Sequence, residues 1–430
     1  MSSAGAQKAG GVFRQYLPDL SQPRFTTAKD QDAYSYADTF KSKQVPPWLY
    51  NLTQTWERLY EEPYKGVTSD GNVVSGLYQE QDEGVEMAQI VGSAAILLAR
   101  LSIEERANLL FPINAKEWRA WSNPEVLLRP LGLRLEEVDN MVQDSIFSIM
   151  KATLSPEGYA KALDAMRVNH FLGELCDMPR VMNRLSYNFL IFATPSTTRP
   201  WGWSLYGHHL CLNVFLRGTQ IVISPTFTGA EPNMIDDGEY FGTELLHVEG
   251  RLGLKLMQSL PRELAQAAQT YKLLCDPGMR QTGNLATDRW NQDDQRHLCG
   301  AFRDNRIVPY EGIRVSAMDK EQRDLVLDIA EQFLLYLPDT ARAIRKKQIA
   351  SHFQETFFSW IGGYNEDNGQ DSGEPFYFRI QSPVVILEFD HHSGVFLTNK
   401  EPARFHIHTI VRTPNAGDYG GALRGPGEAL

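Results

Sequence analysis

The 430-residue sequence is poor in cysteine, with four residues at scattered positions and no pair in CxxC spacing. Such a pattern excludes a disulfide framework and a thiolate zinc knuckle, and it fits a reducing compartment. The N-terminal residues 1–17 also lack the apolar segment of a secretory signal. A cytoplasmic location is therefore expected. The cysteines are Cys176, Cys211, Cys275 and Cys299.

An excess of positive charge and long apolar runs are absent as well. The formal net charge is −11, and the longest basic run is Arg345-Lys346-Lys347, which argues against a nucleic-acid partner. The most apolar window, residues 87–102, is followed by Glu104 and Glu105 and is too short to span a bilayer. We expect no membrane insertion.

Several catalytic signatures are missing. The sequence contains no GxSxG elbow, no HExxH helix, no GxxxxGK[ST] loop and no GxGxxG strand–helix fingerprint. Their absence argues against triad hydrolysis, phosphate-loop chemistry and hydride transfer on a dinucleotide-binding domain.

What the chain does contain is a composition that can form a large core, with 42% hydrophobic and 11% aromatic residues. Residues 1–45, rich in Ser, Gln, Asp and Lys, are expected to form an irregular arm. Residues 46–430 are expected to form a single α+β unit, in which 46–186 is mainly helical and 187–430 mixes strands with helices. No internal repeat is evident in the sequence.

The element pattern predicts an α+β fold, because helical and extended periodicities are segregated along the chain. The helical N-terminal part is expected to pack on a mostly antiparallel sheet that bears a histidine-rich site. Ser102 and Glu105 form a capping-box pattern that starts a helix, and Arg217-Gly218 marks a hairpin. Strands are predicted within residues 187–196, 202–218, 219–229, 375–381, 383–390 and 404–412, and helices within 45–66, 87–120, 136–176, 242–274, 319–337 and 339–363.

The histidines are the clearest functional signal. His406 and His408 stand two residues apart in an expected strand and so project from the same face. Imidazole pairs of this kind suit zinc, iron, copper and nickel. His208 and His209 lie in another expected strand, where they would face opposite sides, and His209 shares its side with the polar Asn213. His209, His406 and His408 are therefore the predicted metal ligands.

Carboxylates near these histidines are candidates for catalytic roles. Glu388 and Asp390 share one face of an expected strand, and either could ligate the cation or orient an imidazole. With His208, they are the predicted catalytic residues. His391 and His392 either take part or lie exposed in a loop. Glu249 is a further carboxylate that is more simply explained by a salt bridge. The remaining histidines, interpreted as structural, are His170, His247, His297 and His352.

Aromatic residues and one arginine precede the histidine and carboxylate strands. They are predicted to line an apolar pocket for a small anionic or oxygenated substrate, although each would also suit an ordinary core. The predicted substrate-binding residues are Trp203, Tyr206, Trp360, Tyr377 and Arg379.

Longer motifs carry a resemblance to a known family. The segments PWGWSLYGHHLCLN, SPTFTGAEP, WIGG, FYFRIQSPVVILEFD and FHIHTIVRTPNAGDYG resemble the family called domain of unknown function 3500. Weaker matches extend the resemblance from about Gly66 to Tyr419. The resemblance implies that the family retains residues matching His208, His209, Asp390, His406 and His408, and that the His391-His392 pair belongs to a subset. The family name supplies no reaction.

These observations lead to the expectation of a metal-dependent enzyme that acts on a small, apolar metabolite. The cofactor would be a divalent transition metal, with Fe(II) favoured and Cu or Zn as alternatives. The favoured activity is that of a non-heme iron or copper oxygenase or oxidoreductase. A zinc-dependent hydrolase or lyase is the second hypothesis, and a non-catalytic metal- or ligand-binding protein is the third. The oligomeric state stays open.

Overall fold

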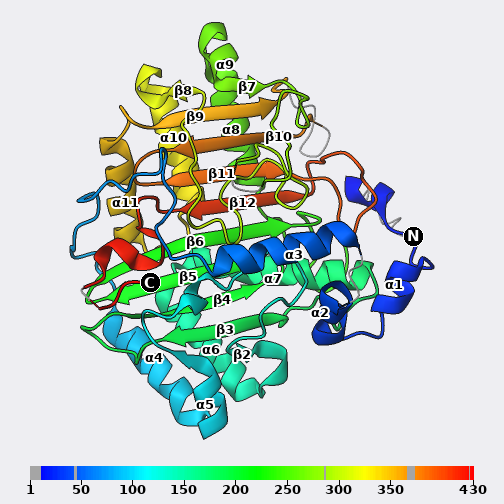
Figure 1. Ribbon diagram of the computed structural model, residues 1–430, viewed down its shortest axis with the longest axis vertical. Helices are drawn as coiled ribbons and strands as arrows, with labels where there is room; N and C mark the ends of the chain where they lie inside the picture. Colours follow the sequence, from blue (N-terminus) through cyan, green and yellow to red (C-terminus); the bar gives the residue numbers. More distant parts are fainter. Residues whose placement is uncertain (1–10, 43–45, 285–286, 366–372, 426) are drawn as a thin grey trace, which may run out of the picture.

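One twisted sheet runs along the molecule in the computed structural model, which describes residues 11–42, 46–284, 287–365, 373–425 and 427–430 (Figure 1). The described residues contribute twelve strands in the order β1-β3-β4-β5-β6-β12-β11-β10-β9-β7, with β2 beside β3 and β8 beside β9. Neighbouring strands are antiparallel except β1 with β3 and β7 with β9. The strands are β1 (Leu110–Phe111), β2 (Leu133–Arg134), β3 (Tyr187–Phe192), β4 (Trp201–Gly207), β5 (Leu210–Arg217), β6 (Gln220–Ala230), β7 (Gln269–Tyr271), β8 (Ile313–Arg314), β9 (Phe357–Gly362), β10 (Phe376–Gln381), β11 (Ile386–His391) and β12 (Ile407–Arg412).

Helices precede, separate and follow these strands, which confirms the predicted α+β class. The α-helices are α1 (Pro23–Ala28), α2 (Ala33–Ser42), α3 (Pro47–Tyr60), α4 (Met87–Arg100), α5 (Ile103–Leu109), α6 (Asn140–Thr153), α7 (Pro156–Leu175), α8 (His247–Ser259), α9 (Arg262–Ala268), α10 (Lys320–Phe333) and α11 (Asp339–Ser351). The 3₁₀ segments are η1 (Val12–Tyr16), η2 (Lys116–Arg119), η3 (Leu135–Glu137), η4 (Val315–Ala317) and η5 (Asp418–Leu423).

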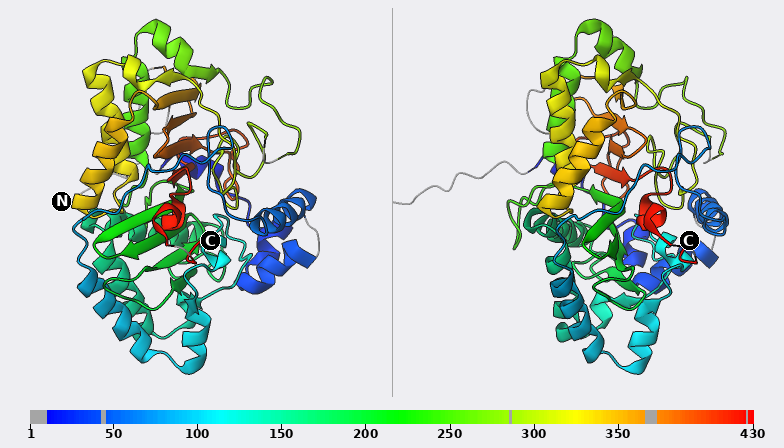
Figure 2. Two further views of the ribbon diagram at one scale, coloured as in Figure 1. Left: turned by 60° about the vertical axis from the view of Figure 1, so that its left-hand side comes forward. Right: turned by 90° about the vertical axis from the view of Figure 1, so that its left-hand side faces the viewer.

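The two faces of the sheet have different covers, as Figure 2 shows. On the helix face, apolar side chains of alternate strand positions pack against α4, α6, α7, α8, α10 and α11. On the loop face, the other positions pack against α1, α2, α3, long loops and η5. Strand β11 illustrates the alternation, because Leu387 and Phe389 belong to the helix-face core whereas Glu388 and Asp390 point to the loop face.

The sheet is built from two segments with the same order of elements. Apart from η2, which lies between β1 and β2 and has no counterpart, the series α4, α5, β1, β2, η3, α6, α7, β3, β4, β5, β6 recurs as α8, α9, β7, β8, η4, α10, α11, β9, β10, β11, β12. Gly132 and Gly312 occupy matching positions before β2 and β8, with φ of +72° and +83°. A Cβ there would lie 2.2 Å from the carbonyl oxygen of Phe189 and 2.1 Å from that of Phe358, so both positions require glycine.

This repeat of elements is not visible as a repeat in the sequence. The two segments share architecture rather than residues, since a layer architecture needs only the burial pattern, a few glycines and the helix caps to agree. Asp139 and Asp319, for example, cap the matching helices α6 and α10 through the backbone N–H groups of Val142 and Gln322.

Several local predictions are confirmed and others are wrong. The capping box of Ser102 and Glu105 starts α5, and the hairpin at Arg217-Gly218 joins β5 to β6. The helix expected over 339–363 ends at Ser351, because the aromatic run that follows pairs with β10 as strand β9. Within the arm expected to be irregular, residues 11–42 contain η1, α1 and α2. Helices α1 and α2 bury apolar side chains against the loop face, whereas η1 buries Phe13 in the helix-face core. No described helix is long and apolar enough to cross a membrane.

Candidate metal centre

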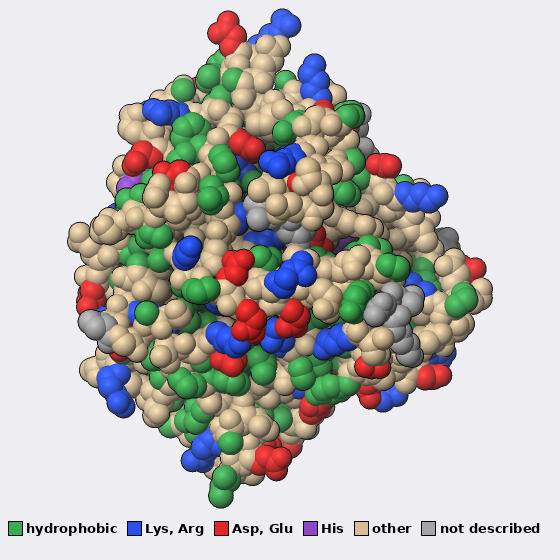
Figure 3. Space-filling model, viewed as in Figure 1, with side chains coloured by type: hydrophobic (Ala, Val, Ile, Leu, Met, Phe, Trp, Pro, Cys, Tyr) green, Lys and Arg blue, Asp and Glu red, His purple; other side chains and the backbone are tan. Residues whose placement is uncertain are grey.

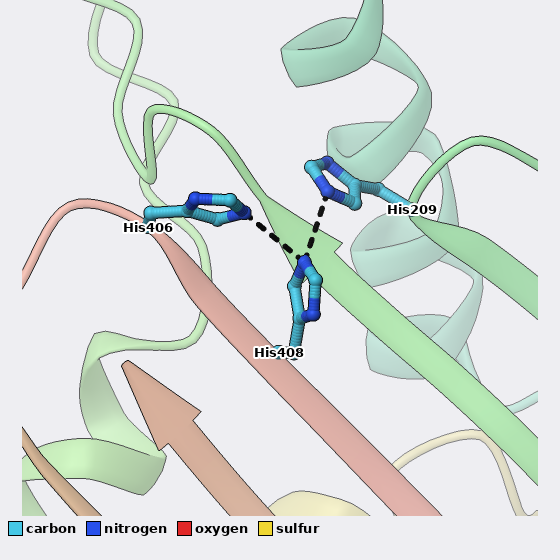
Figure 4. A group of neighbouring side chains, drawn as sticks. All are labelled: His209, His406 and His408. Carbon is cyan, nitrogen blue, oxygen red and sulfur yellow. Dashed lines mark hydrogen bonds between the residues drawn. The ribbon is translucent and has the colours of Figure 1, made fainter. Parts of the chain in front are cut away.

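Three histidines from two parts of the chain converge on the loop face near the middle of the sheet. His408 lies on β12, His406 directly precedes that strand, and His209 lies in the turn between β4 and β5. Figure 4 shows the three rings pointing toward one another. The pairing of β6 with β12 brings these segments together, since His408 lies opposite Gly229, whose backbone N–H donates to the carbonyl oxygen of His209.

His209 is held in an unusual backbone conformation. Residues 202–218, expected to be one strand, form β4 and β5 with His208 and His209 in the tight turn between them. His209 has φ of +61°, a left-handed conformation that non-glycine residues adopt at a cost. Its backbone N–H donates to the carbonyl oxygen of Asn123. The strand-alternation argument for choosing His209 over His208 was therefore wrong, because their rings stack 3.8 Å apart instead of facing opposite sides.

The distances within the trio match those of metal ligands. The Nε2 atom of His408 lies 3.1 Å from Nε2 of His406 and 3.2 Å from Nε2 of His209. Nitrogens bonded to one cation at about 2.0–2.1 Å lie about 2.8–3.4 Å apart in octahedral or tetrahedral geometry. The three nitrogens together form a group that could hold one metal ion.

The ring of His406 is fixed in the tautomer that a cation requires. Its Nδ1 lies 2.9 Å from the carbonyl oxygen of Ser393, which can only accept a hydrogen bond. Nδ1 therefore carries the proton, and the lone pair of Nε2 points into the trio. A backbone carbonyl commonly orients a metal-bound imidazole in this way.

Burial keeps the trio uncharged. His209, His406 and His408 are at most 4% exposed. Burial lowers the pKa values of His209 and His408 well below the usual value, and neighbouring imidazoles lower them further. Burial also lowers the pKa of His406, although the carboxylate of Glu231 opposes this effect. Neutral imidazole is the form that binds a metal ion.

His208, predicted to be catalytic, lies beside the trio rather than within it. Its Nδ1 donates to Oδ1 of Asn169 at 2.8 Å, because the amide nitrogen of Asn169 donates elsewhere. Burial, and to a smaller extent the neighbouring imidazole of His406, lowers the pKa of His208 to about 3. The ring lines a small pocket together with Arg134, Asn188 and Tyr206.

The two predicted catalytic carboxylates are both buried on the loop face. Glu388 accepts hydrogen bonds from the hydroxyl of Tyr377 at 2.7 Å and from the backbone N–H groups of Leu298 and Cys299. Burial alone would raise the pKa of Glu388, but the neighbouring His297 and Arg379 lower it below the usual range. Asp390 forms an ion pair with Arg296, with Nε and Oδ1 2.6 Å apart.

A second group of histidines lies next to the first. The ligand nitrogens of His297, His392 and His408 lie within 4.8 Å of one another. His297 and His392 are both at most 2% exposed, so the alternative in which His392 lies exposed in a loop is wrong. His391 instead faces Phe376, whose backbone lies 3.0 Å from its Nδ1. Sequence alone offered no signal for His297, because its segment joins the site only through tertiary contacts.

The predicted substrate-binding residues do not form one pocket. Trp203 and Trp360 lie in the helix-face core, so they cannot line a site on the loop face. Tyr206 lines the pocket beside His208, whereas Tyr377 contacts Glu388. Arg379 forms an ion pair with Glu311 at 3.0 Å. Trp203 and Tyr206 differ because residues three apart in a strand point to opposite faces.

Charged side chains near the site and on the molecular surface above it were also compared with the predictions. Glu249, on α8, pairs with Lys161 at 2.5 Å and does not reach the histidines. Figure 3 shows positive and negative side chains intermingled over the loop face, with little histidine at the surface. No single-sign patch marks this view of the molecule.

A family model described as "Protein of unknown function (DUF3500)" matches residues 83–421. No curated protein and no solved structure matches the chain.

Proposed function

Since the chain belongs to the DUF3500 family, whose description assigns no activity, we propose from the site itself that the protein is a metal-dependent enzyme. His209, His406 and His408 would hold a divalent transition metal. The observation that carries this proposal is the convergence of three neutral Nε2 atoms, with separations of 3.1 and 3.2 Å about His408.

The chemistry of the donors favours copper or iron and an oxidative reaction on a small molecule. Three imidazoles leave coordination positions free for dioxygen or substrate. The usual iron triad includes a carboxylate, and the nearest carboxylate of this trio, Glu231, lies 3.8 Å from Nδ1 of His406 rather than beside its Nε2. The donor set therefore fits copper at least as well as Fe(II).

The pocket beside His208 is the natural place for a substrate. Its lining combines polar groups of Arg134 and Asn188 with apolar side chains of Val126 and Leu128. His208 separates this pocket from His209, onto which its ring stacks. The free volume of about 20 Å³ holds little more than one water molecule, so a small molecule with an apolar part and a polar group would enter only if the lining side chains moved apart.

A second candidate is a zinc-dependent hydrolase or lyase. Zinc with three histidines activates a bound water, which a nearby carboxylate can deprotonate. The closeness of Glu388 and Asp390 to the second histidine group supports this alternative. Both candidate functions use the same three histidines, so the identity of the metal that supports activity distinguishes them.

The test is reconstitution of protein that was purified without a histidine tag and stripped with a chelator. We expect Cu(II) or Fe(II) to support oxygen consumption with small amphipathic substrates. His209→Ala should bind the metal at least 10–100-fold more weakly, as expected for loss of a ligand or its support. His247→Ala, at the partly exposed start of α8, is the matched control and should bind normally.

Two outcomes would overturn the proposal. Full turnover with zinc in the absence of oxygen would show that the reaction is a hydrolysis rather than an oxidation. Equal metal affinity of the wild type and His209→Ala would show that the three histidines do not bind the metal.

A further inference from the structure

A buried carboxylate, that of Glu231, lies beside the trio at the end of β6. Glu231 directly follows Ala230, the last residue of β6, which lies opposite Ile407 on β12. The pairing of these two strands therefore sets Glu231 next to His406. The side chain of Glu231 is 0% exposed, and its Oε1 lies 3.8 Å from Nδ1 of His406.

One oxygen of Glu231 holds the loop that follows β11. This oxygen, Oε1, accepts hydrogen bonds at 2.9, 3.1 and 3.0 Å from the backbone N–H groups of Val395, Phe396 and Leu397. Consecutive backbone N–H groups of this kind form a concave anion-binding site. The same loop carries the carbonyl oxygen of Ser393, which fixes the tautomer of His406. Glu231 therefore holds the loop that orients this ligand.

The loop does not explain the other oxygen of Glu231. Its Oε2 is buried and makes no hydrogen bond. A buried acceptor without a partner is costly, and a buried charge without a partner costs more. The only ion-pair contact of Glu231 among the described residues is with the ring of His406, which burial keeps neutral. The loop needs one acceptor atom, so the second oxygen and the negative charge require another explanation.

A cation bound to His406 supplies that explanation. Coordination through Nε2 withdraws electrons from the ring and makes the N–H group at Nδ1 more positive, and a carboxylate nearby stabilises this charge. We propose that Glu231 is a positioning residue of the metal site, which holds the loop that orients His406 and balances the charge of the cation bound through that ring. This role rests on the proposed function for its cation, and it explains why a carboxylate rather than a neutral acceptor lies at the end of β6.

The test separates the charge of Glu231 from its hydrogen bonds in untagged, full-length protein. Glu231→Gln keeps an oxygen acceptor on a side chain of the same length but lacks the charge, whereas Glu231→Asp keeps the charge on a shorter side chain. We expect Glu231→Gln to bind Cu(II) about 10–100-fold more weakly and to lose less affinity for Cu(I), which carries less charge. Glu231→Asp should weaken the binding of both copper ions by similar factors. Competition with chelators of known affinity measures these dissociation constants.

Glu83→Gln is the matched control. Glu83 is 1% exposed and lies beside the opposite end of β6, where its Oε2 accepts the backbone N–H of Ile221 at 2.9 Å. The substitution makes the same change of charge far along the strand from the histidines, so both copper affinities should keep their wild-type values. Equal losses in Glu83→Gln and Glu231→Gln would show a general effect of removing a buried carboxylate and would overturn the proposal.

Three further outcomes distinguish the role of Glu231 from the proposed function. If His209→Ala loses copper while Glu231→Gln binds both copper ions as the wild type does, the trio stands and the role of Glu231 is overturned. If Glu231→Gln weakens Cu(II) and Cu(I) by the same factor, Glu231 acts on the loop alone and the charge balance is overturned. Wild-type protein that binds neither copper ion would overturn both proposals.

Hydrogen exchange of the wild type covers the case in which Glu231→Gln does not fold. Copper should slow the exchange of the backbone N–H groups of residues 395–397, because a cation at His406 fixes the carboxylate that accepts them. Exchange that is unchanged by copper would overturn the role of Glu231.

Discussion

At the scale of single residues, the close approach of His209 and His408 depends on the glycine between them. Gly229 on β6 lies opposite His408, and a Cβ on it would lie 2.8 Å from Cδ2 of His209 and 3.0 Å from Cδ2 of His408. Carbon atoms are not found so close without displacement of one of them. The metal site therefore requires a residue without a side chain at position 229.

Substitution of Gly229→Ala should open the trio without removing a ligand. The methyl group would push the two imidazoles aside, and overpacking of this kind costs about 1–3 kcal/mol. We expect metal affinity to fall by roughly 5- to 150-fold, the equivalent of that free energy. Isothermal titration of the metal-free protein measures the change.

Gly92→Ala is the control for this substitution. Gly92 lies within α4 and has open space where its Cβ would be, so alanine should raise helix stability by about 0.5–1 kcal/mol and leave metal affinity alone. A Gly229→Ala protein with wild-type affinity would show that the two rings need not be this close.

At the scale of elements, the two matching segments start their central helices with the same device. The side chain of Asp139 accepts from the backbone N–H of Val142 at 2.9 Å, and that of Asp319 accepts from the N–H of Gln322 at 2.9 Å. Both helices follow a short strand and a 3₁₀ segment, and both pack on the helix face. The caps therefore set where each helix begins relative to the strand that it covers.

Removal of either cap should have a similar effect on stability. We expect Asp139→Ala and Asp319→Ala each to lower the free energy of unfolding by about 0.5–2 kcal/mol, because one backbone N–H group loses its partner. Urea denaturation measures the loss. The double variant should lose the sum within about 0.5 kcal/mol, since the two caps belong to separate halves of the sheet.

Asp144→Ala provides the comparison, since Asp144 is exposed within α6 and caps no helix. Its effect should stay within about 0.5 kcal/mol. If Asp144→Ala lowered the free energy of unfolding as much as Asp139→Ala, the loss of a negative charge, rather than the loss of the cap, would explain both effects.

At the scale of the whole molecule, the trio joins the two matching halves. The sheet passes from one half to the other at the pairing of β6 with β12. His209 comes from the first half, whereas His406 and His408 come from the second. A bound cation would therefore bridge the halves at their junction.

Metal should in consequence stabilise the whole chain. At a free metal concentration of about 100 times Kd, the free energy of unfolding should rise by about 2.7 kcal/mol, because the unfolded chain has no preformed site. Thermal unfolding of chelator-treated and metal-loaded protein measures the difference. His209→Ala should abolish it and His247→Ala should retain it. Identical unfolding midpoints with and without metal would contradict a junction role for the cation.

The sequence by itself determined the features that depend on local periodicity. Alternation along residues 404–412 places His406 and His408 on one side, and the same alternation places Glu388 and Asp390 together on β11. The capping box at Ser102 and the overall α+β class follow from equally local patterns. These features need only the neighbours of each residue along the chain.

Tertiary structure alone decided which of these local features meet. The order of strands sets β6 against β12 and so brings His209 to His408, although 198 residues separate the two in sequence. The same contacts bring His297 next to the trio and reveal the repeat of elements. Strand order is chosen by the burial of whole faces rather than by adjacent residues, and for that physical reason a single sequence leaves it open.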